Sequence, residues 1–227
     1  MRFDVISLFP ELVQAIASCG VVGRALRERL AQLHTWQMRD WAEPPHFRVD
    51  ARPYGGGPGM VLRADVLHRA LQAVRAEDAS APAHVIAMGA SGQRLDQSRV
   101  RQLTRHPRLI IVAGRYAGLD ERFIAAEVDL ELSVGDYILS GGELPAMSLI
   151  DALVRQIPGA LGNAGSLDDD GFGPDGALDY PRYTRPPEFA GQPVPEVLLR
   201  GNHAEIRRWR EAQARERTRR RAACDDE

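Results

Sequence analysis

The stretch Ser133–Ala146 reads SVGDYILSGGELPA and places three glycines among polar residues directly before a helical pattern. Glycine lets the backbone take positive φ and lets a ligand approach the main chain closely. The following residues, Ala146–Arg155, carry apolar side chains at helical spacing. The stretch therefore leads into a helix whose first N–H groups have no partners within the helix. We expect it to bind a ligand through main-chain atoms.

Two other glycine loops, Gly89–Gly92 and Gly114–Gly118, resemble it in position along the chain. Each of the three loops follows a short apolar run, and helical patterns lie before or between the runs. The runs are His84–Met88, Leu109–Ala113 and Leu130–Val134. This alternation predicts an α/β fold with a mainly parallel sheet, in which ligands gather at the carboxyl ends of the strands. No loop matches GxGxxG, so the three should converge on an adenine with a small polar tail rather than on a dinucleotide.

The other predicted elements follow from hydrophobic spacing and from glycine and proline. Strands are expected at Arg2–Leu8 and Trp36–Arg39, helices at Glu11–Ala17, Val22–Leu33, Asp65–Arg75 and His203–Arg221, and an open loop at Tyr54–Met60. The Gly- and Asp-rich run 162–176 has no apolar period and is typical of a flexible linker. It divides the chain into a large domain, 1–161, and a small, mostly helical domain, 177–227.

Composition excludes several classes of protein. The chain has 227 residues, no lysine, and no apolar run of about 18 residues or signal peptide, so we expect a soluble cytoplasmic protein with neither a Walker A loop nor a lysine Schiff base. Cys19 and Cys224 lack metal-ligand spacing and are predicted to be free thiols. The net charge is −2, yet Arg200–Arg221 holds nine arginines against three glutamates. That segment is a local basic patch, which suits RNA or simply a solvated helix face.

Three strings together resemble the bacterial tRNA (guanine-N1)-methyltransferases, the TrmD family of the SPOUT (trefoil-knot) methyltransferase superfamily. They are the glycine stretch above, Gly114–Arg122 (GRYAGLDER) and Asn202–Arg210 (NHAEIRRWR), and the resemblance runs from Met1 to about Arg210. It implies a deep trefoil knot, a homodimer, and methylation of N1 of guanosine 37 in tRNA by S-adenosylmethionine. The cofactor-binding positions that it implies are Met88, Gly89, Gly114, Val134, Gly135, Asp136, Tyr137, Ile138, Leu139, Gly141, Gly142 and Pro145.

Guanine N1 carries a proton in the neutral base, so methyl transfer requires a general base near N1 and a cation near O6. The family alignment places the catalytic aspartate at Asp170 and the catalytic arginine at Arg155. The alignment needs one extra residue between Phe172 and Gly176, which leaves Asp169 as a rival for the base. Without the resemblance, an acidic triplet beside glycine is a solvated loop.

The implied partner is the tRNA anticodon stem-loop with guanosine at position 37, and neither a membrane nor DNA is expected to bind. Single-stranded loops are recognised by aromatic and arginine side chains. The RNA-contact candidates are Tyr54, Arg182, Tyr183, His203, Arg207, Arg208 and Trp209, the last of which is equally suited to a core position. Ala117 departs from the family, which usually has Glu there. That glutamate is associated with the donor's amino group and with magnesium, so the Mg²⁺ requirement is in doubt.

Two alternative hypotheses remain open at this point. One is a related knotted methyltransferase that acts on a ribose 2′-hydroxyl or on another base, and would not need Asp170. The other is an RNA-binding or adenosine-sensing module in which the basic C-terminal segment carries the function.

Overall fold

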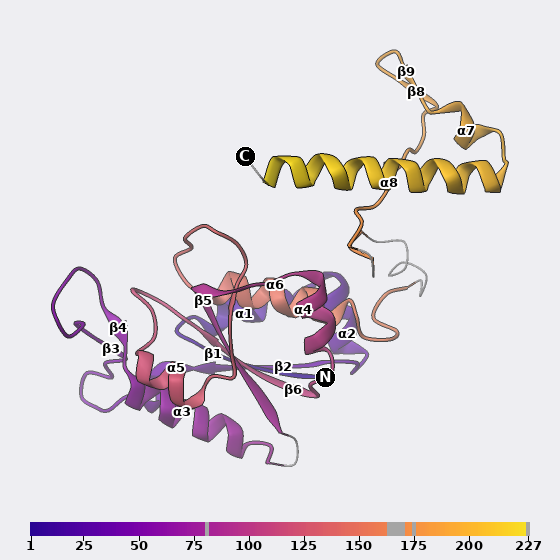
Figure 1. Cartoon of the computed structure of the whole chain (residues 1–227). Helices are drawn as coiled ribbons and strands as arrows, with labels where there is room; N and C mark the ends of the chain where they lie inside the picture. Colours follow the sequence, from indigo (N-terminus) through magenta and orange to yellow (C-terminus); the bar gives the residue numbers. More distant parts are fainter. Residues whose placement is uncertain (80–81, 163–170, 174–175, 226–227) are drawn as a thin grey trace. The chain divides into compact units, whose positions relative to one another are not determined.

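A computed structural model describes residues 1–79, 82–162, 171–173 and 176–225. The chain forms two compact units, Met1–Gly162 and Asn163–Glu227 (Figure 1). The larger unit contains a five-stranded sheet, and the smaller one contains a long helix. No described helix is long and apolar enough to cross a membrane.

The sheet of the larger unit is entirely parallel, in the order β2-β1-β6-β5-β7 (Figure 1). Its strands are β1 (Arg2–Ser7), β2 (Gln32–Gln37), β5 (Ala83–Arg94), β6 (Arg108–Ala113) and β7 (Leu130–Ser133). β3 (Asp50–Ala51) and β4 (Val61–Leu62) form a separate, antiparallel two-stranded ribbon. The glycine-rich loop Tyr54–Met60 lies between these two strands. The predicted α/β class with a mainly parallel sheet is confirmed.

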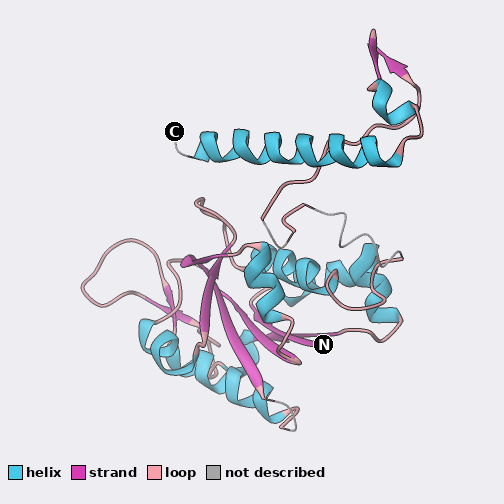
Figure 2. Ribbon diagram, turned by 45° about the vertical axis from the view of Figure 1, so that its right-hand side comes forward, coloured by secondary structure: helices cyan, strands magenta, loops and turns pink. Residues whose placement is uncertain are grey.

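Helices cover both faces of this sheet (Figure 2). On one face lie α1 (Pro10–Gln14), α2 (Gly20–Arg27), α4 (Gln97–Leu103) and α6 (Glu143–Val154). On the other face lie α3 (Ala64–Ala76) and α5 (Glu121–Glu127), and short 3-10 turns occur at Ala15–Ser18 and Met38–Trp41.

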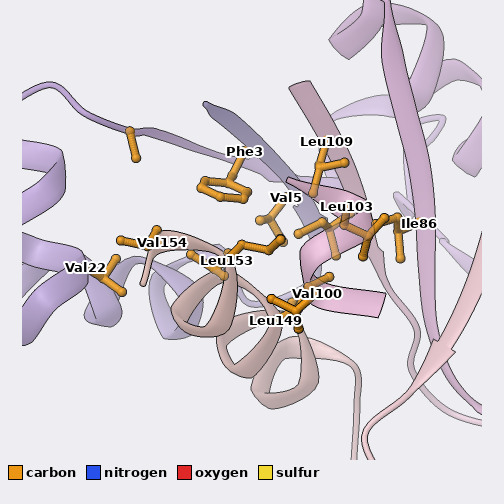
Figure 3. Packing of buried hydrophobic residues seen from close by; sticks show 14 of the residues in the cluster. Phe3, Val5, Val22, Ile86, Val100, Leu103, Leu109, Leu149, Leu153 and Val154 are labelled. Atoms are coloured by element: carbon orange, nitrogen blue, oxygen red, sulfur yellow. The ribbon is translucent and has the colours of Figure 1, made fainter. Parts of the chain in front are cut away.

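Successive residues of one strand pack into opposite cores, which explains the continuous apolar runs in the sequence. In β6, Leu109 and Ile111 join the core under α6, whereas Ile110 and Val112 join the core under α3. Figure 3 shows Leu109 gathered with side chains of β1 and α6 in the first core. The predicted helix Asp65–Arg75 is found as α3, and its residues Val66, Leu67, Leu71 and Val74 are buried at helical spacing.

The helical pattern predicted over Val22–Leu33 is wrong at its C-terminal end. Helix α2 ends at Arg27, Arg29 takes positive φ (59°), and β2 begins at Gln32 rather than at Trp36. Strand β2 lies at an edge of the sheet and pairs only with β1. An edge strand can carry polar residues, and here they obscure the alternation of apolar side chains that would predict a strand.

The loop predicted at Gly89–Gly92 is also wrong, because these residues lie inside β5, where the pairing with β7 shifts register between Met88 and Gln93. A Cβ on Gly92 would lie 2.5 Å from the backbone nitrogen of Leu132, so glycine is needed where the two strands cross closely. Helix α6 begins at Glu143, three residues before the predicted start, with Gly142 as its N-cap.

A buried ion pair ties the amino ends of the strands together. Asp4 of β1 and Arg108 of β6 are 0% and 1% exposed, and Arg108 Nε donates to Asp4 Oδ2 over 2.8 Å. Arg2 and the indole N–H of Trp36 also donate to Asp4. The carboxylate is therefore fully hydrogen-bonded, as a buried charge must be.

The smaller unit contains a hairpin of β8 (Glu188–Phe189) and β9 (Gln192–Pro193), the short α7 (Glu196–Leu199) and the long α8 (His203–Asp225). The Asn202 side chain caps α8 by accepting from the backbone N–H of Ala204. Thr218 of α8 accepts a hydrogen bond from the Leu178 N–H over 2.9 Å, which fastens the segment before the hairpin to the helix. The predicted helix His203–Arg221 is thus present and four residues longer.

Candidate active site

A cavity of about 480 Å³ opens where β6 and β7 end and where β5 shifts register. Its walls come from the Met88–Ser91 segment, the Gly114–Leu119 loop and the Glu131–Gly142 segment. Eleven of the twelve predicted cofactor-binding residues line it: Met88, Gly89, Gly114, Val134, Gly135, Tyr137, Ile138, Leu139, Gly141, Gly142 and Pro145. Asp136 is the exception, and its side chain is exposed. The structure brings together three segments that are far apart in the sequence.

The loop after β7 is fixed by a carboxylate that is 1% exposed, that of Glu143 at the first position of α6. The Arg115 guanidinium donates through Nε to both of its oxygens, at 3.0 and 3.2 Å. Ser7, at the end of β1, donates its hydroxyl to the same carboxylate over 2.8 Å. The Arg115 guanidinium also lies 4.4 Å from the centre of the Phe9 ring. One buried charge thus joins β1, the loop after β6 and the start of α6.

Main-chain contacts complete this joint. The Gly142 N–H donates to the Gly114 carbonyl over 2.7 Å, and Arg115 forms an antiparallel bridge with Gly141. A Cβ on Gly142 would lie 2.7 Å from the Gly114 nitrogen, and one on Gly141 would lie 2.4 Å from a carboxylate oxygen of Glu143. The two glycines are therefore required by close packing as well as by any ligand.

The sequence did not single out several residues that line the same cavity. Arg115 and Glu121 lie in the recognised string GRYAGLDER, and Glu131 lies in β7 just before the glycine stretch. Glu121 and Glu131 are carboxylates that face the cavity without a hydrogen bond or ion pair to any other described residue. The sequence feature that could have indicated them is their position, since each lies within a few residues of a glycine loop.

A second cavity, of about 850 Å³, lies between the β3–β4 ribbon and the start of α5 and shares Leu119 and Glu121 with the first. Tyr54, a predicted RNA contact, lies at its edge and is 96% exposed. Asp120 also lines it, and the pKa of Asp120 is lowered because Arg122 donates hydrogen bonds to its carboxylate.

Arg155 is the C-cap of α6, whereas the first cavity lies at the amino end of that helix. Twelve residues of helix rise about 18 Å, so within one chain Arg155 is not brought to the cavity. Asp169 and Asp170 lie outside the described residues.

The remaining RNA-contact candidates belong to the smaller unit. Arg182, Tyr183 and Trp209 line a cavity of about 340 Å³ in that unit. His203, Arg207 and Arg208 are exposed along the first turns of α8. Neither Arg207 nor Arg208 forms an ion pair with another residue for which the structure gives a position.

Ala117 also lines the first cavity, and its methyl group faces the glycine-rich loop, 3.4 Å from where a Cβ on Gly59 would lie. A methyl group offers no ligand to a metal. Within the described ranges, no three His, Cys, Asp or Glu side chains are grouped so as to hold a metal ion. At position 117 this chain therefore lacks the carboxylate that the family usually has.

The fold and the cavity define a parallel α/β protein with a cavity at the carboxyl ends of its strands, lined largely by glycine-rich segments. A family model described as "tRNA (Guanine-1)-methyltransferase TrmD" matches residues 1–224. The chain belongs to this family of methyltransferases and is an enzyme of that class.

Relatives named tRNA (guanine-N(1)-)-methyltransferase resemble the chain over almost its whole length. Those of Pseudomonas fluorescens (strain SBW25) and Pasteurella multocida (strain Pm70) are 53% and 52% identical over 218 residues, covering 96% of this chain and 86% and 88% of their own. That of Halorhodospira halophila is 54% identical over 217 residues, covering 96% of this chain and 81% of its own.

Two glycines of the first cavity offer a matched test of the close packing. Gly142→Ala should lower the free energy of unfolding of the larger unit by about 1–3 kcal/mol, because the new methyl group meets the Gly114 backbone. Gly89→Ala should change it by less than about 1 kcal/mol, because nothing lies within 4 Å of the added Cβ. Urea unfolding followed by tryptophan fluorescence in a Trp209→Phe background reports on this unit, because the remaining tryptophans, Trp36 and Trp41, both lie in it. Equal free energies of unfolding for the two variants would contradict this, because they would show that the backbone around Gly142 can accommodate a methyl group.

Proposed function

We propose that this protein transfers the methyl group of S-adenosylmethionine to N1 of guanosine 37 in tRNA. Family membership supports the reaction class, and the cavity between the three segments is the observation that carries the assignment of the donor site. Its volume of about 480 Å³ lies within the range of small-molecule sites. Six of its lining residues are glycines, which let main-chain groups approach a ligand such as an adenine with a small polar tail.

The donor is assigned to the cavity lined by the Gly135–Gly142 loop, with Glu121 and Glu131 as the nearby carboxylates. Such a donor carries two cationic groups, the sulfonium and the ammonium, against one carboxylate, so negative side chains at the wall favour its binding. Glu143 is not available for this role because Arg115 and Ser7 already occupy its oxygens.

In the proposed reaction, Asp170 accepts the N1 proton while the N1–methyl bond forms and the sulfur–methyl bond breaks. Arg155 stabilises the negative charge that develops on O6. An aspartate with a pKa of about 3.9 is a weak base in water, so RNA bound over it must raise that value by desolvation. Alignment of the acceptor with the activated methyl group supplies much of the remaining rate enhancement.

We also propose a homodimer. The position of Arg155, one helix length from the cavity of its own chain, supports a site that a second copy completes. Four exposed apolar side chains beside the cavity support a contact surface there: Tyr137, Ile138, Leu139 and Leu144. The trefoil knot stays an expectation from family resemblance.

The tRNA anticodon stem-loop is the proposed partner, with Tyr54 in the larger unit and Arg182, Tyr183, His203, Arg207 and Arg208 in the smaller unit as its contacts. Aromatic and arginine side chains suit a loop whose bases are unstacked. The target base must leave its stack, at a cost of a few kcal/mol, before it can meet the donor. A cytoplasmic location follows from the proposed substrate.

The target atom can be tested directly with labelled S-adenosylmethionine and two tRNA transcripts that differ only at position 37. Transfer to the guanosine 37 transcript and none to the adenosine 37 transcript is expected, with the label on N1 by nucleoside mass spectrometry. A label on a ribose 2′-hydroxyl would favour the related methyltransferase hypothesis, and binding without transfer would favour an RNA-binding module.

The base is tested by three neighbouring substitutions. Asp170→Ala should lower kcat by about 100-fold or more, because N1 then keeps its proton, while donor binding by calorimetry is unchanged. Asp168→Ala is the matched control and should leave kcat near that of the original protein. Loss in Asp169→Ala alone would move the role to Asp169, and full turnover in both Asp169→Ala and Asp170→Ala would refute the assignment of the base.

The dimer is tested by light scattering together with turnover. The original protein should show twice the mass of one chain, and Leu144→Glu should shift it toward the monomer and lower methyl transfer with it, because a charge replaces a half-exposed apolar contact. A strictly monomeric protein with full activity would rule the dimer out.

A further inference from the structure

The smaller unit contains a cavity of its own, of about 340 Å³, which we call the aromatic pocket. It is lined by Tyr180, Pro181, Arg182, Tyr183, Leu198, Ile206, Trp209 and Arg210. The rings of Tyr183 and Trp209 are inclined at 53°, with centroids 6.2 Å apart. The guanidinium groups of Arg182 and Arg210 lie 4.9 and 4.5 Å from the centre of the Tyr180 ring. Three aromatic rings and two guanidinium groups thus surround one hollow.

The aromatic pocket is not a closed core. In the part of the smaller unit that the structure describes, no residue is buried, and Tyr183 is 49% exposed. Rings that serve packing alone are usually covered more completely than this, because exposure forfeits most of the gain from burying them. The ring of Tyr183 is therefore accessible to a ligand, whereas that of Tyr180 already lies against the guanidinium groups of Arg182 and Arg210.

The chemistry of the pocket wall selects a planar ligand attached to an anion. None of its eight lining residues is acidic, and no ion pair joins Arg210 to another described residue. Arg207 and Arg208 directly precede Trp209 on α8 and are exposed. Arg182 pairs with Asp179 over 3.3 Å, so the cations of this region that no described carboxylate neutralises are Arg207, Arg208 and Arg210. Flat rings beside such guanidinium groups are the combination that binds single-stranded nucleotides, with the base on a ring and the phosphate on arginine.

We propose that the aromatic pocket binds one unstacked base of the tRNA, other than the methylated one, with Arg207, Arg208 and Arg210 on the adjoining phosphates. This inference rests on the proposed tRNA substrate and adds a second point of attachment in the smaller unit. A base held there fixes the loop by stacking, whatever its identity, because every base presents a π face.

The test combines two substitutions at Tyr183 with abasic anticodon stem-loops, each lacking one loop base in turn. Tyr183→Leu keeps apolar bulk and removes the ring, and should weaken binding of the intact RNA about tenfold. Tyr183→Phe keeps the ring and should bind as tightly as the original protein. For the original protein, one of the abasic RNAs should bind about tenfold more weakly than the intact RNA. For Tyr183→Leu, that abasic RNA and the intact RNA should bind with equal affinity, because the ring that the base contacts is already missing.

Phe189→Leu is the control, because Phe189 is an aromatic residue of the same unit that is 77% exposed and lies outside the aromatic pocket. It should leave affinity unchanged. Full affinity of Tyr183→Leu, or losses that simply multiply for every abasic RNA, would overturn the proposal, as would a change in the oligomeric mass of Tyr183→Leu. Methyl transfer by the original protein is measured separately. If the enzyme is active but the affinity losses from Tyr183→Leu and from each abasic RNA are independent, base binding in the aromatic pocket is refuted and the proposed function stands.

Discussion

The buried carboxylate of Glu143 is the constraint on which the first cavity depends. It lies at the first position of α6, where the exposed N–H groups of the helix favour negative charge, and Arg115 and Ser7 occupy its oxygens. A buried charge without partners is costly, so the three segments that supply these groups are held in one arrangement. The loops around the cavity are therefore positioned before any ligand arrives.

The two ends of the sheet are fastened by different buried charges. At the amino ends, Asp4 and Arg108 link β1 to β6, and the side chains of Arg108, Arg2 and Trp36 donate the hydrogen bonds that Asp4 accepts. At the carboxyl ends, Glu143 links the same two strands through Ser7 and Arg115 but leaves the cavity beside it. The Asp4–Arg108 pair and the cavity thus lie toward opposite ends of the strands, and the carboxyl ends are where parallel α/β proteins ordinarily bind ligands.

The sequence predicted what depends on local pattern and missed what depends on distant neighbours. The apolar runs of β6 and β7 and the helical spacing of α3 were sufficient to predict these elements. A strand of a parallel sheet is buried on both faces, so it appears in the sequence as a continuous apolar run. The start of strand β2 was predicted four residues too late because an edge strand tolerates polar residues, here Gln32, His34 and Thr35. Gly89–Gly92 was predicted as a loop because the nearness of Leu132, which explains Gly92, is invisible along the chain. The burial of Glu143 could not be predicted either, since a charged residue near a helix start is ordinarily solvated.

Because Gly141 and Gly142 are pressed against Glu143 and Gly114, this wall of the cavity has little freedom to change. An inhibitor that hydrogen-bonds to main-chain atoms of this wall would therefore be hard to escape by mutation. Side-chain replacements at Ile138 or Leu139 leave the backbone groups in place, and replacement of either glycine damages the joint that shapes the cavity. Drug resistance would more readily arise at other lining positions such as Ala117, where a larger side chain could narrow the cavity.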